Sequence, residues 1–257
     1  MKTPNKITNK LGGLEIQAWG TDTLEAGAYL LGEHPYQFKM LVLNSESEFT
    51  LSEQDIYCFY LYSHSSDFLG VTIDGETLGP NQTFWLTQPN AFGVQCQVGS
   101  CVLLVGSLKL QETQARKSKL LNENDVKKIS KPWGYELWLT GDPSPYFAFK
   151  KIFIKSGTKT SLQYHNKKRE TNFLVAGEAI LHYNPRLDVP ANQFQPKDVA
   201  LIQLHPLSTI DVFPKSVHRL EAVTDMLLFE VSTPELDDVV RISDDSGRKD
   251  GRINSEH

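Results

Sequence analysis

The sequence predicts an all-β protein built from two strand-rich halves. Most of the chain consists of short runs rich in β-branched and aromatic residues, and Gly, Pro, Asn and Asp separate these runs. Sustained helical periodicity is rare. Many short strands at regular spacing indicate a β-sandwich or a β-barrel in each half. The 257 residues, of which 40% are hydrophobic and 22% charged, are enough for two such units.

The expected strands all share this composition. In order along the chain they are residues 38–44, 57–63, 70–75, 83–88, 101–110, 147–157, 171–177, 178–184, 199–204, 208–213 and 225–233. Each half contains a hairpin bounded by glycine, then a loop with proline and a final apolar strand. The two halves correspond in pattern without identity of residues, which indicates an old duplication.

Residues 111–130 differ from the strands on both sides, because they are polar, charged and free of Gly and Pro. They are the clearest candidate for a helical turn or two, and their composition indicates an interdomain linker. We therefore expect a first domain over residues 1–112, a short polar and partly helical linker over 113–130, and a second domain over 131–257.

Composition also limits the partners and the location of the protein. The net charge is −5, so no overall basic field attracts nucleic acid. No apolar run is long enough to cross a bilayer, and the N-terminal segment lacks the apolar region of a secretory signal. We expect a cytoplasmic protein with neither a nucleic-acid partner nor a membrane partner.

The three cysteines, Cys58, Cys96 and Cys101, form neither a CxxC pair nor a zinc-ribbon spacing. We interpret them as buried or half-buried thiols. A disulfide between Cys96 and Cys101 is the alternative, and the lack of a secretory route disfavours it.

The segment between residues 157 and 177 predicts a metal site. Gln163 and His165 are two residues apart, so on a strand their side chains point to the same side. Glu170 begins the next strand, and His218 follows a proline-bearing turn much later in the chain. If the barrel brings these strands together, imidazole, carboxylate and amide donors converge. This set suits one divalent metal ion (Zn, Mn, Fe, Co or Ni) with a position left open for substrate or water.

The same pattern resembles the two sequence motifs of the cupin family, in which the first carries His-x-His and Glu between glycines and the second carries Pro and His. The positions that carry the resemblance are Gly157, Gln163, His165, Glu170, Gly177, Pro214 and His218. Gln replaces the first His in the cupin domain of type II mannose-6-phosphate isomerases, which residues 131–248 resemble. Segments such as KPWGYELWL, FPKSVHRLEA and EVSTPELDDVVRISDDSGR extend the match.

The resemblance implies a bicupin, with a double-stranded β-helix (jelly-roll) barrel in each half. The first half resembles a cupin in strand layout alone and has no His-x-His or Gln-x-His, so we expect a degenerate, metal-free barrel there. Three features depart from the isomerase pattern. Nothing resembles the nucleotidyltransferase domain of the bifunctional members, Lys215 stands where the second motif has glycine, and residues 184–211 form a longer, proline-rich connection that would change the substrate.

The activity that the resemblance implies is a metal-dependent isomerisation of an aldose and a ketose, on a sugar phosphate or a related carbohydrate. Removal of a proton next to a carbonyl creates an enediolate, which a divalent cation stabilises. Glu170 and Glu230 are the candidate catalytic bases.

Four cations are candidates for binding the anionic group of such a substrate. Lys151 and Arg219 lie on or near the expected barrel strands. Arg169 lies in the basic turn NKKRE, which either binds a phosphate or is a solvated turn. Arg241 either points to the site or pairs with the acidic residues of the C-terminal tail.

Two other functions stay open. An iron-dependent cupin dioxygenase of a small molecule would use a similar mixed His and Glu ligand set. A non-catalytic sugar-binding or regulatory bicupin is compatible with the degenerate first half. A monomer and a homodimer are both compatible with two barrels in one chain.

Overall fold

The computed structural model describes residues 16–18, 25–52, 54–87, 91–110, 117–141, 146–185 and 193–256. These residues form antiparallel strands with three short 3-10 turns and no α-helix. The all-β prediction is confirmed. Across these ranges no helix is long and apolar enough to cross a membrane.

The described residues form two compact units. Unit 1 contains those of 25–127 and 139–149, and unit 2 contains those of 16–18, 128–138 and 150–256. These units differ from the expected domain boundaries in two places. The short strand β1 (Ile16–Ala18) pairs with a strand of unit 2, and the described residues of 139–149, expected in the second domain, belong to unit 1.

Unit 1 is made of two antiparallel sheets. The six-stranded sheet has the order β11 (Lys117–Asn122), β8 (Gln82–Thr87), β5 (Ile56–His64), β10 (Ser100–Leu108), β3 (Tyr36–Asn44) and β2 (Gly27–Glu33). The four-stranded sheet has the order β4 (Glu48–Leu51), β9 (Phe92–Cys96), β6 (Val71–Ile73) and β7 (Glu76–Leu78). Alternate residues of both sheets, among them Leu41, Phe59, Phe84 and Val94, form one buried hydrophobic cluster. Packed hydrocarbon therefore fills the inside of this barrel.

All three cysteines lie in unit 1 and are buried free thiols, as the sequence predicts. Burial raises the pKa of Cys58 to about 12, even though Thr83 contacts its sulfur.

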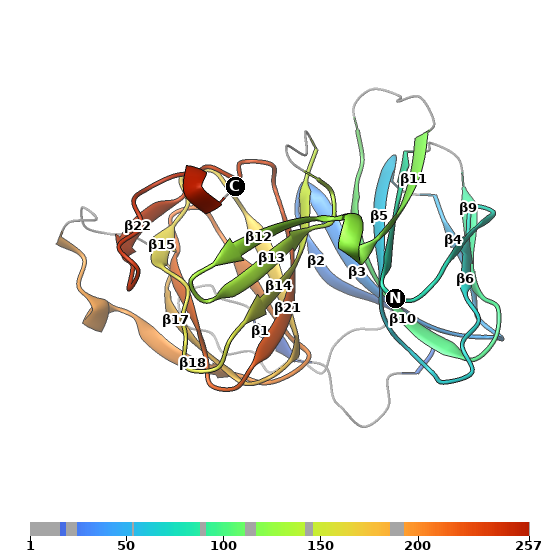
Figure 1. Cartoon of the computed structure of the whole chain (residues 1–257), viewed down its shortest axis with the longest axis horizontal. Helices are drawn as coiled ribbons and strands as arrows, with labels where there is room; N and C mark the ends of the chain where they lie inside the picture. Colours follow the sequence, from blue (N-terminus) through green and yellow to red (C-terminus); the bar gives the residue numbers. More distant parts are fainter. Residues whose placement is uncertain are drawn as a thin grey trace. The chain divides into compact units, whose positions relative to one another are not determined.

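Unit 2 also has two antiparallel sheets, which enclose the second barrel (Figure 1). The seven-stranded sheet has the order β1, β19 (Ser208–Val212), β16 (Glu170–Ala176), β21 (Met226–Ser232), β14 (Ala148–Ile154), β13 (Gly134–Trp138) and β12 (Lys127–Lys131). The five-stranded sheet has the order β18 (Ala200–Leu204), β17 (Ala179–Asn184), β20 (Val217–Ala222), β15 (Leu162–Tyr164) and β22 (Val240–Ser243). The 3-10 turns η3 (Pro196–Asp198) and η4 (Asn254–Glu256) complete the described part of this unit.

The polar stretch 111–130 is mostly strand in its described part, and the helical expectation there reduces to a single turn. Strand β11 pairs with β8, the 3-10 turn η1 (Glu123–Asp125) follows, and β12 begins at Lys127. Strand β11 is the edge of its sheet and almost all of its residues are exposed. An exposed edge strand lacks the apolar alternation by which strands are recognised, and charged residues there discourage pairing with other chains. Residues 111–116 lie outside the described residues.

Candidate functional site

The inside of unit 2 changes from apolar to polar along each of three adjacent strands. In β14 the inward side chains are Ile154, Ile152 and then Lys150. In β21, Leu228 is followed by Glu230 on the same face. A hydrocarbon floor therefore lies beneath a polar chamber.

The same change occurs in β16, where Leu174 belongs to the hydrocarbon floor and Asn172 and Glu170 line the chamber. The chamber is a cavity of about 120 Å³. Six cationic and four anionic side chains line it, although the whole protein is acidic. The inside of this barrel therefore carries a charge opposite in sign to that of the whole protein.

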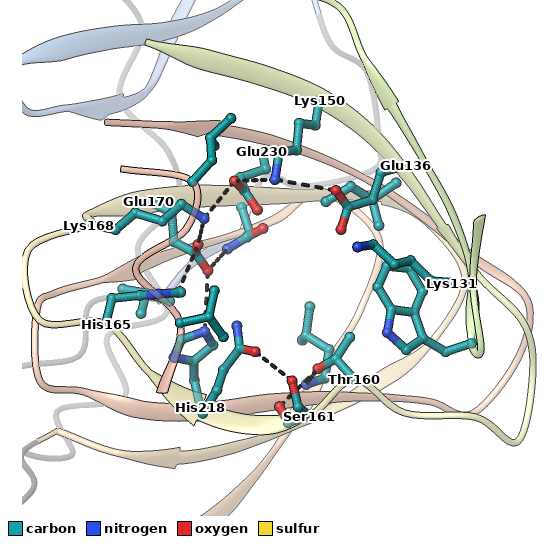
Figure 2. A pocket seen from close by; sticks show the side chains of 18 of the residues that line it. Lys131, Glu136, Lys150, Thr160, Ser161, His165, Lys168, Glu170, His218 and Glu230 are labelled. Carbon is teal, nitrogen blue, oxygen red and sulfur yellow. Dashed lines mark hydrogen bonds and ion pairs between the residues drawn. The ribbon is translucent and has the colours of Figure 1, made fainter. Parts of the chain in front are cut away.

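A row of alternating charges crosses the inner face of the seven-stranded sheet (Figure 2). Lys168 donates hydrogen bonds to Glu170 and, at 2.9 Å, to Glu230. Lys150 Nζ lies 3.6 Å from Glu230 Oε1 and 3.3 Å from Glu136 Oε2. All five residues are buried, so pairing offsets the cost of removing their charges from water.

The far end of the row is held by Trp138, whose Nε1 donates to Glu136 Oε2 at 2.8 Å. Burial alone would raise the pKa of Glu136, but Lys150 and Lys131 outweigh it and hold that pKa at about 2. Glu136 is therefore a fixed negative charge at neutral pH.

Three predicted metal ligands meet at the other end of the row. His165 Nε2 lies 3.5 Å from Glu170 Oε2, and His218 Nε2 lies 3.4 Å from Glu170 Oε1. One nitrogen or oxygen from each residue lies within 4.8 Å of the others, and all three residues are buried. Figure 2 shows the two imidazoles and the carboxylate pointing toward one another at the edge of the cavity.

The tautomer of both histidines follows from their outer contacts. Nδ1 of His165 contacts the backbone carbonyl of Asp238, and Nδ1 of His218 lies 3.2 Å from the carbonyl of Ser216. A carbonyl oxygen accepts only, so Nδ1 carries a proton in each ring, and in the neutral form of either ring Nε2 presents a lone pair to the site. This is how metal-binding imidazoles are usually oriented.

The cluster fits a divalent cation by the chemistry of its donors. The buried Nε2 of His165 has no hydrogen-bond partner in the described part of the chain. Burial lowers the pKa of His165, and the ammonium of Lys168 acts in the same direction, so the neutral imidazole is the favoured form. Metal ligands must be deprotonated, so this buried group of two imidazoles and a carboxylate could hold a metal ion.

Glu170 is oriented from behind by two further side chains. Lys168 bonds to its Oε2, and Asn172 Nδ2 donates to its Oε1 at 3.2 Å. Burial by itself would raise the pKa of Glu170, but Lys168 and the two imidazoles hold it well below its usual value. The carboxylate is thus ionised and fixed in orientation.

Gln163, the fourth predicted ligand, lines the same cavity and is the direct strand partner of His218. Its Oε1 accepts a hydrogen bond of 2.5 Å from Ser161 Oγ. An amide oxygen has two lone pairs, so this bond leaves one for a metal ion. Gln163 as a ligand stays a prediction.

Of the four cations predicted to bind substrate, Arg241 lines the cavity, and Lys151, Arg169 and Arg219 do not. The guanidinium of Arg169 stacks on Phe213, 3.8 Å from the ring centre. Arg219 donates to the carbonyl of Ser243 at 3.1 Å. Both contacts hold surrounding segments of the barrel.

The sequence interpretation missed the amines and one acid of the charged row, which are Lys150, Lys168 and Glu136. A signal for two of them was present. Lys150 alternates with Ile152 and Ile154, and Lys168 precedes Glu170 by two residues, which is the spacing that places side chains on one face. Glu136 lies in the stretch KPWGYELWL, which carries part of the family resemblance and gives no separate signal for a charged cavity residue.

Comparisons with solved structures agree with this architecture. The E. coli protein Ylba superposes with a TM-score of 0.62 and 11% identity, covering 90% of this chain and 94% of that one. Oxalate decarboxylase from Lactobacillus farciminis superposes with a TM-score of 0.56 and 10% identity, covering 78% of this chain and 77% of that one. An iolb-like protein from Salmonella typhimurium superposes with a TM-score of 0.57 and 11% identity, covering 77% of this chain and 83% of that one.

The chain has the cupin fold. At these identities the similarity establishes the fold alone. No family model matches the sequence, and no curated protein matches it. The metal-capable cluster lies in the second barrel, at the positions where the sequence motifs predict it.

Proposed function

We propose that this cupin is a metal-dependent enzyme that interconverts an aldose and a ketose of a small sugar phosphate or related carbohydrate. The observation that carries the proposal is the buried group His165, Glu170 and His218, which adjoins a cavity lined by three lysines. The resemblance of residues 131–248 to type II mannose-6-phosphate isomerases supplies the reaction class. A bound divalent cation would polarise the substrate carbonyl and stabilise negative charge on its oxygen.

The cavity favours a short substrate with an anionic group. Its volume of about 120 Å³ is below the roughly 300–1,000 Å³ of cavities that enclose drug-sized ligands. Cations outnumber anions among the charged residues that line it, which favours a negatively charged ligand. A nucleotide-linked sugar would exceed this space.

Glu230 is the better of the two predicted bases. Both oxygens of Glu170 are already engaged, one by Lys168 and one by Asn172, and both face the imidazoles. Glu230 accepts from Lys168 through Oε1 only, and within the described ranges its Oε2 has no hydrogen-bond partner. Glu230 Oε2 would take the proton from the carbon next to the carbonyl and return it to the former carbonyl carbon, while the proton of the neighbouring hydroxyl passes to the former carbonyl oxygen.

Lys150 would stabilise the oxygen on which charge develops. Its ammonium lies between Glu136 and Glu230 at distances longer than a strong hydrogen bond, so it retains donors for a ligand. Buried donors aimed at a developing oxyanion need no reorganisation during the reaction. The aromatic ring of Trp138 lies 5.0 Å from Lys150 Nζ, and its face favours the positive charge of the ammonium.

The test is proton exchange in deuterated water. Protein loaded separately with Zn²⁺, Mn²⁺, Fe²⁺, Co²⁺ or Ni²⁺ is incubated with aldose and ketose phosphates from trioses to hexoses, and NMR follows interconversion and deuterium entry at the carbon next to the carbonyl. The proposal predicts both for at least one substrate and metal. The absence of both interconversion and deuterium entry, for every combination of metal and substrate, would contradict the proposal.

A small carboxylate is the second candidate substrate. The fold shared with oxalate decarboxylases and the small cationic cavity favour it. Release of carbon dioxide from dicarboxylates, or consumption of oxygen with the Fe²⁺ form, would identify a decarboxylase or a dioxygenase. Saturable binding of sugar phosphates without turnover would instead identify a binding module.

A further inference from the structure

The C-terminal segment after residue 235 forms one wall of the cavity in unit 2. Leu236, Val239, Arg241 and Ile253 all line the cavity. Strand β22 in this segment pairs with β15, the strand that carries Gln163, and Figure 1 shows the two strands side by side. The C-terminal segment therefore forms the part of the wall that lies beside the strand of Gln163.

Asp238 ties this wall to the loop between His165 and Glu170. Its carboxylate accepts hydrogen bonds from the backbone N–H groups of Asn166 at 3.0 Å, Lys167 at 2.5 Å and Lys168 at 3.0 Å. The side chain of Asn166 donates a further bond at 3.1 Å. Burial would raise the pKa of Asp238, but these donors outweigh it and hold that pKa at about 2. The loop that leads from one metal ligand to the next is thus pinned at three consecutive amides.

The backbone of Asp238 contacts one of the predicted metal ligands. The carbonyl oxygen of Asp238 accepts the Nδ1 proton of His165. In a free neutral histidine either nitrogen can carry the proton. This contact selects the form in which Nε2 faces Glu170.

We propose that Asp238 is a positioning residue for the metal centre, because its carbonyl fixes the tautomer of His165 and its carboxylate fixes the loop that carries Lys168 to Glu170. The proposal rests on the metal site of the proposed function and is independent of the reaction catalysed there. Because linkage is reciprocal, metal binding in turn holds the C-terminal segment in place.

The test compares Asp238→Ala with Asp245→Ala. Asp245 lies in the same segment and carries the same charge, but it pairs with Arg219 and Lys159 and does not contact the 165–168 loop. Co²⁺ alone is the probe, and its affinity is measured by absorption titration and calorimetry. Circular dichroism establishes that both variants are folded.

The result expected is a loss of about 10- to 100-fold in Co²⁺ affinity for Asp238→Ala, the usual range for outer partners of metal ligands, and near wild-type affinity for Asp245→Ala. Equal affinity of folded Asp238→Ala and wild type would overturn the proposal.

Nitrogen NMR of the metal-free protein measures the tautomer of His165, which would not change if Asp238 only stabilised the fold. Wild-type His165 is expected as the Nδ1–H tautomer. Asp238→Ala keeps the backbone carbonyl but loses the carboxylate bonds that hold this carbonyl against His165, so the variant is expected to populate the Nε2–H tautomer. An Nε2–H tautomer in the wild type overturns the proposal, even if Asp238→Ala does not fold. If wild type binds no metal, the proposed function fails, and the tautomer measurement still decides the role of Asp238.

Discussion

Lys150 and Lys151 are consecutive residues of β14, and their side chains lie on opposite faces of the sheet. Lys150 is buried and lines the cavity, whereas Lys151 is half-buried and lies outside the cavity lining. In a strand, one step along the chain reverses the direction of the side chain. The two lysines therefore form a matched pair for testing which face is functional.

Replacement of Lys150 by Met should lower kcat by about 100- to 1,000-fold, the loss typical of removing one donor from a developing oxyanion. Lys151→Met should stay near wild type, and metal content should be unchanged in both. Steady-state kinetics on the substrate found by the exchange assay provide the measurement. A larger loss in Lys151→Met than in Lys150→Met would reverse the assignment.

Gly177 should tolerate alanine less well than Gly157. Both have positive φ, +88° and +74°, which costs an alanine roughly 1–2 kcal/mol. At Gly177 an added Cβ would also lie 2.4 Å from the carbonyl oxygen of Asp225, whereas at Gly157 nothing lies within 4 Å. Gly157→Ala should therefore lower the unfolding free energy by about 1 kcal/mol and Gly177→Ala by more than about 3 kcal/mol. Equal values in urea unfolding would contradict this comparison.

Lys215 occupies the position where the cupin motif has glycine, and its φ is +70°. Its N–H donates to the carbonyl of His165 at 2.7 Å, so the strained turn joins the two motif loops. Lys215→Gly should be more stable than Lys215→Ala by about 1 kcal/mol. Both variants lose the ammonium group, and only glycine relieves the backbone strain of a positive φ. Thermal unfolding should show a difference of roughly 2–4 °C, and a lower midpoint for the glycine variant would be inconsistent with strain.

Acid should destabilise unit 2 through Glu136. Its pKa in the folded protein is about 2, below the ordinary value of 4.5. The contribution of Glu136 to the unfolding free energy is therefore complete above about pH 4.5 and is lost as the pH falls toward 2. Glu136→Gln keeps an acceptor for Trp138 but cannot titrate. In this variant the loss of unfolding free energy between about pH 4.5 and pH 2 should be smaller than in the wild type by on the order of 3 kcal/mol. Urea unfolding at a series of pH values measures this slope, and an unchanged slope would argue against it.

The metal-capable group could be predicted from the sequence because its signals are local. The two-residue spacing of Gln163 and His165 puts them on one face, and the cupin motifs supply Glu170 and His218. The structure brings the two histidines and the glutamate together as expected.

The rest of the site depends on which strands are neighbours. Lys150 reaches Glu230 because β14 and β21 are adjacent in the sheet, although 80 residues of chain separate the two side chains. Asp238 reaches His165 across a similar separation. Such relationships follow from strand order, which alternation and motif spacing do not encode.

Metal titration of three variants tests the central claim most directly. Co²⁺ affinity and the bound metal content are measured for wild type, His165→Ala, His218→Ala and His182→Ala, in which His182 serves as control because it pairs with Glu221 at 2.7 Å outside the cavity lining. The account predicts one metal ion per wild-type chain, loss of more than about 100-fold in affinity for His165→Ala and His218→Ala, and no change for His182→Ala. Unchanged affinity in His165→Ala and His218→Ala, or no metal bound by the wild type, would contradict it.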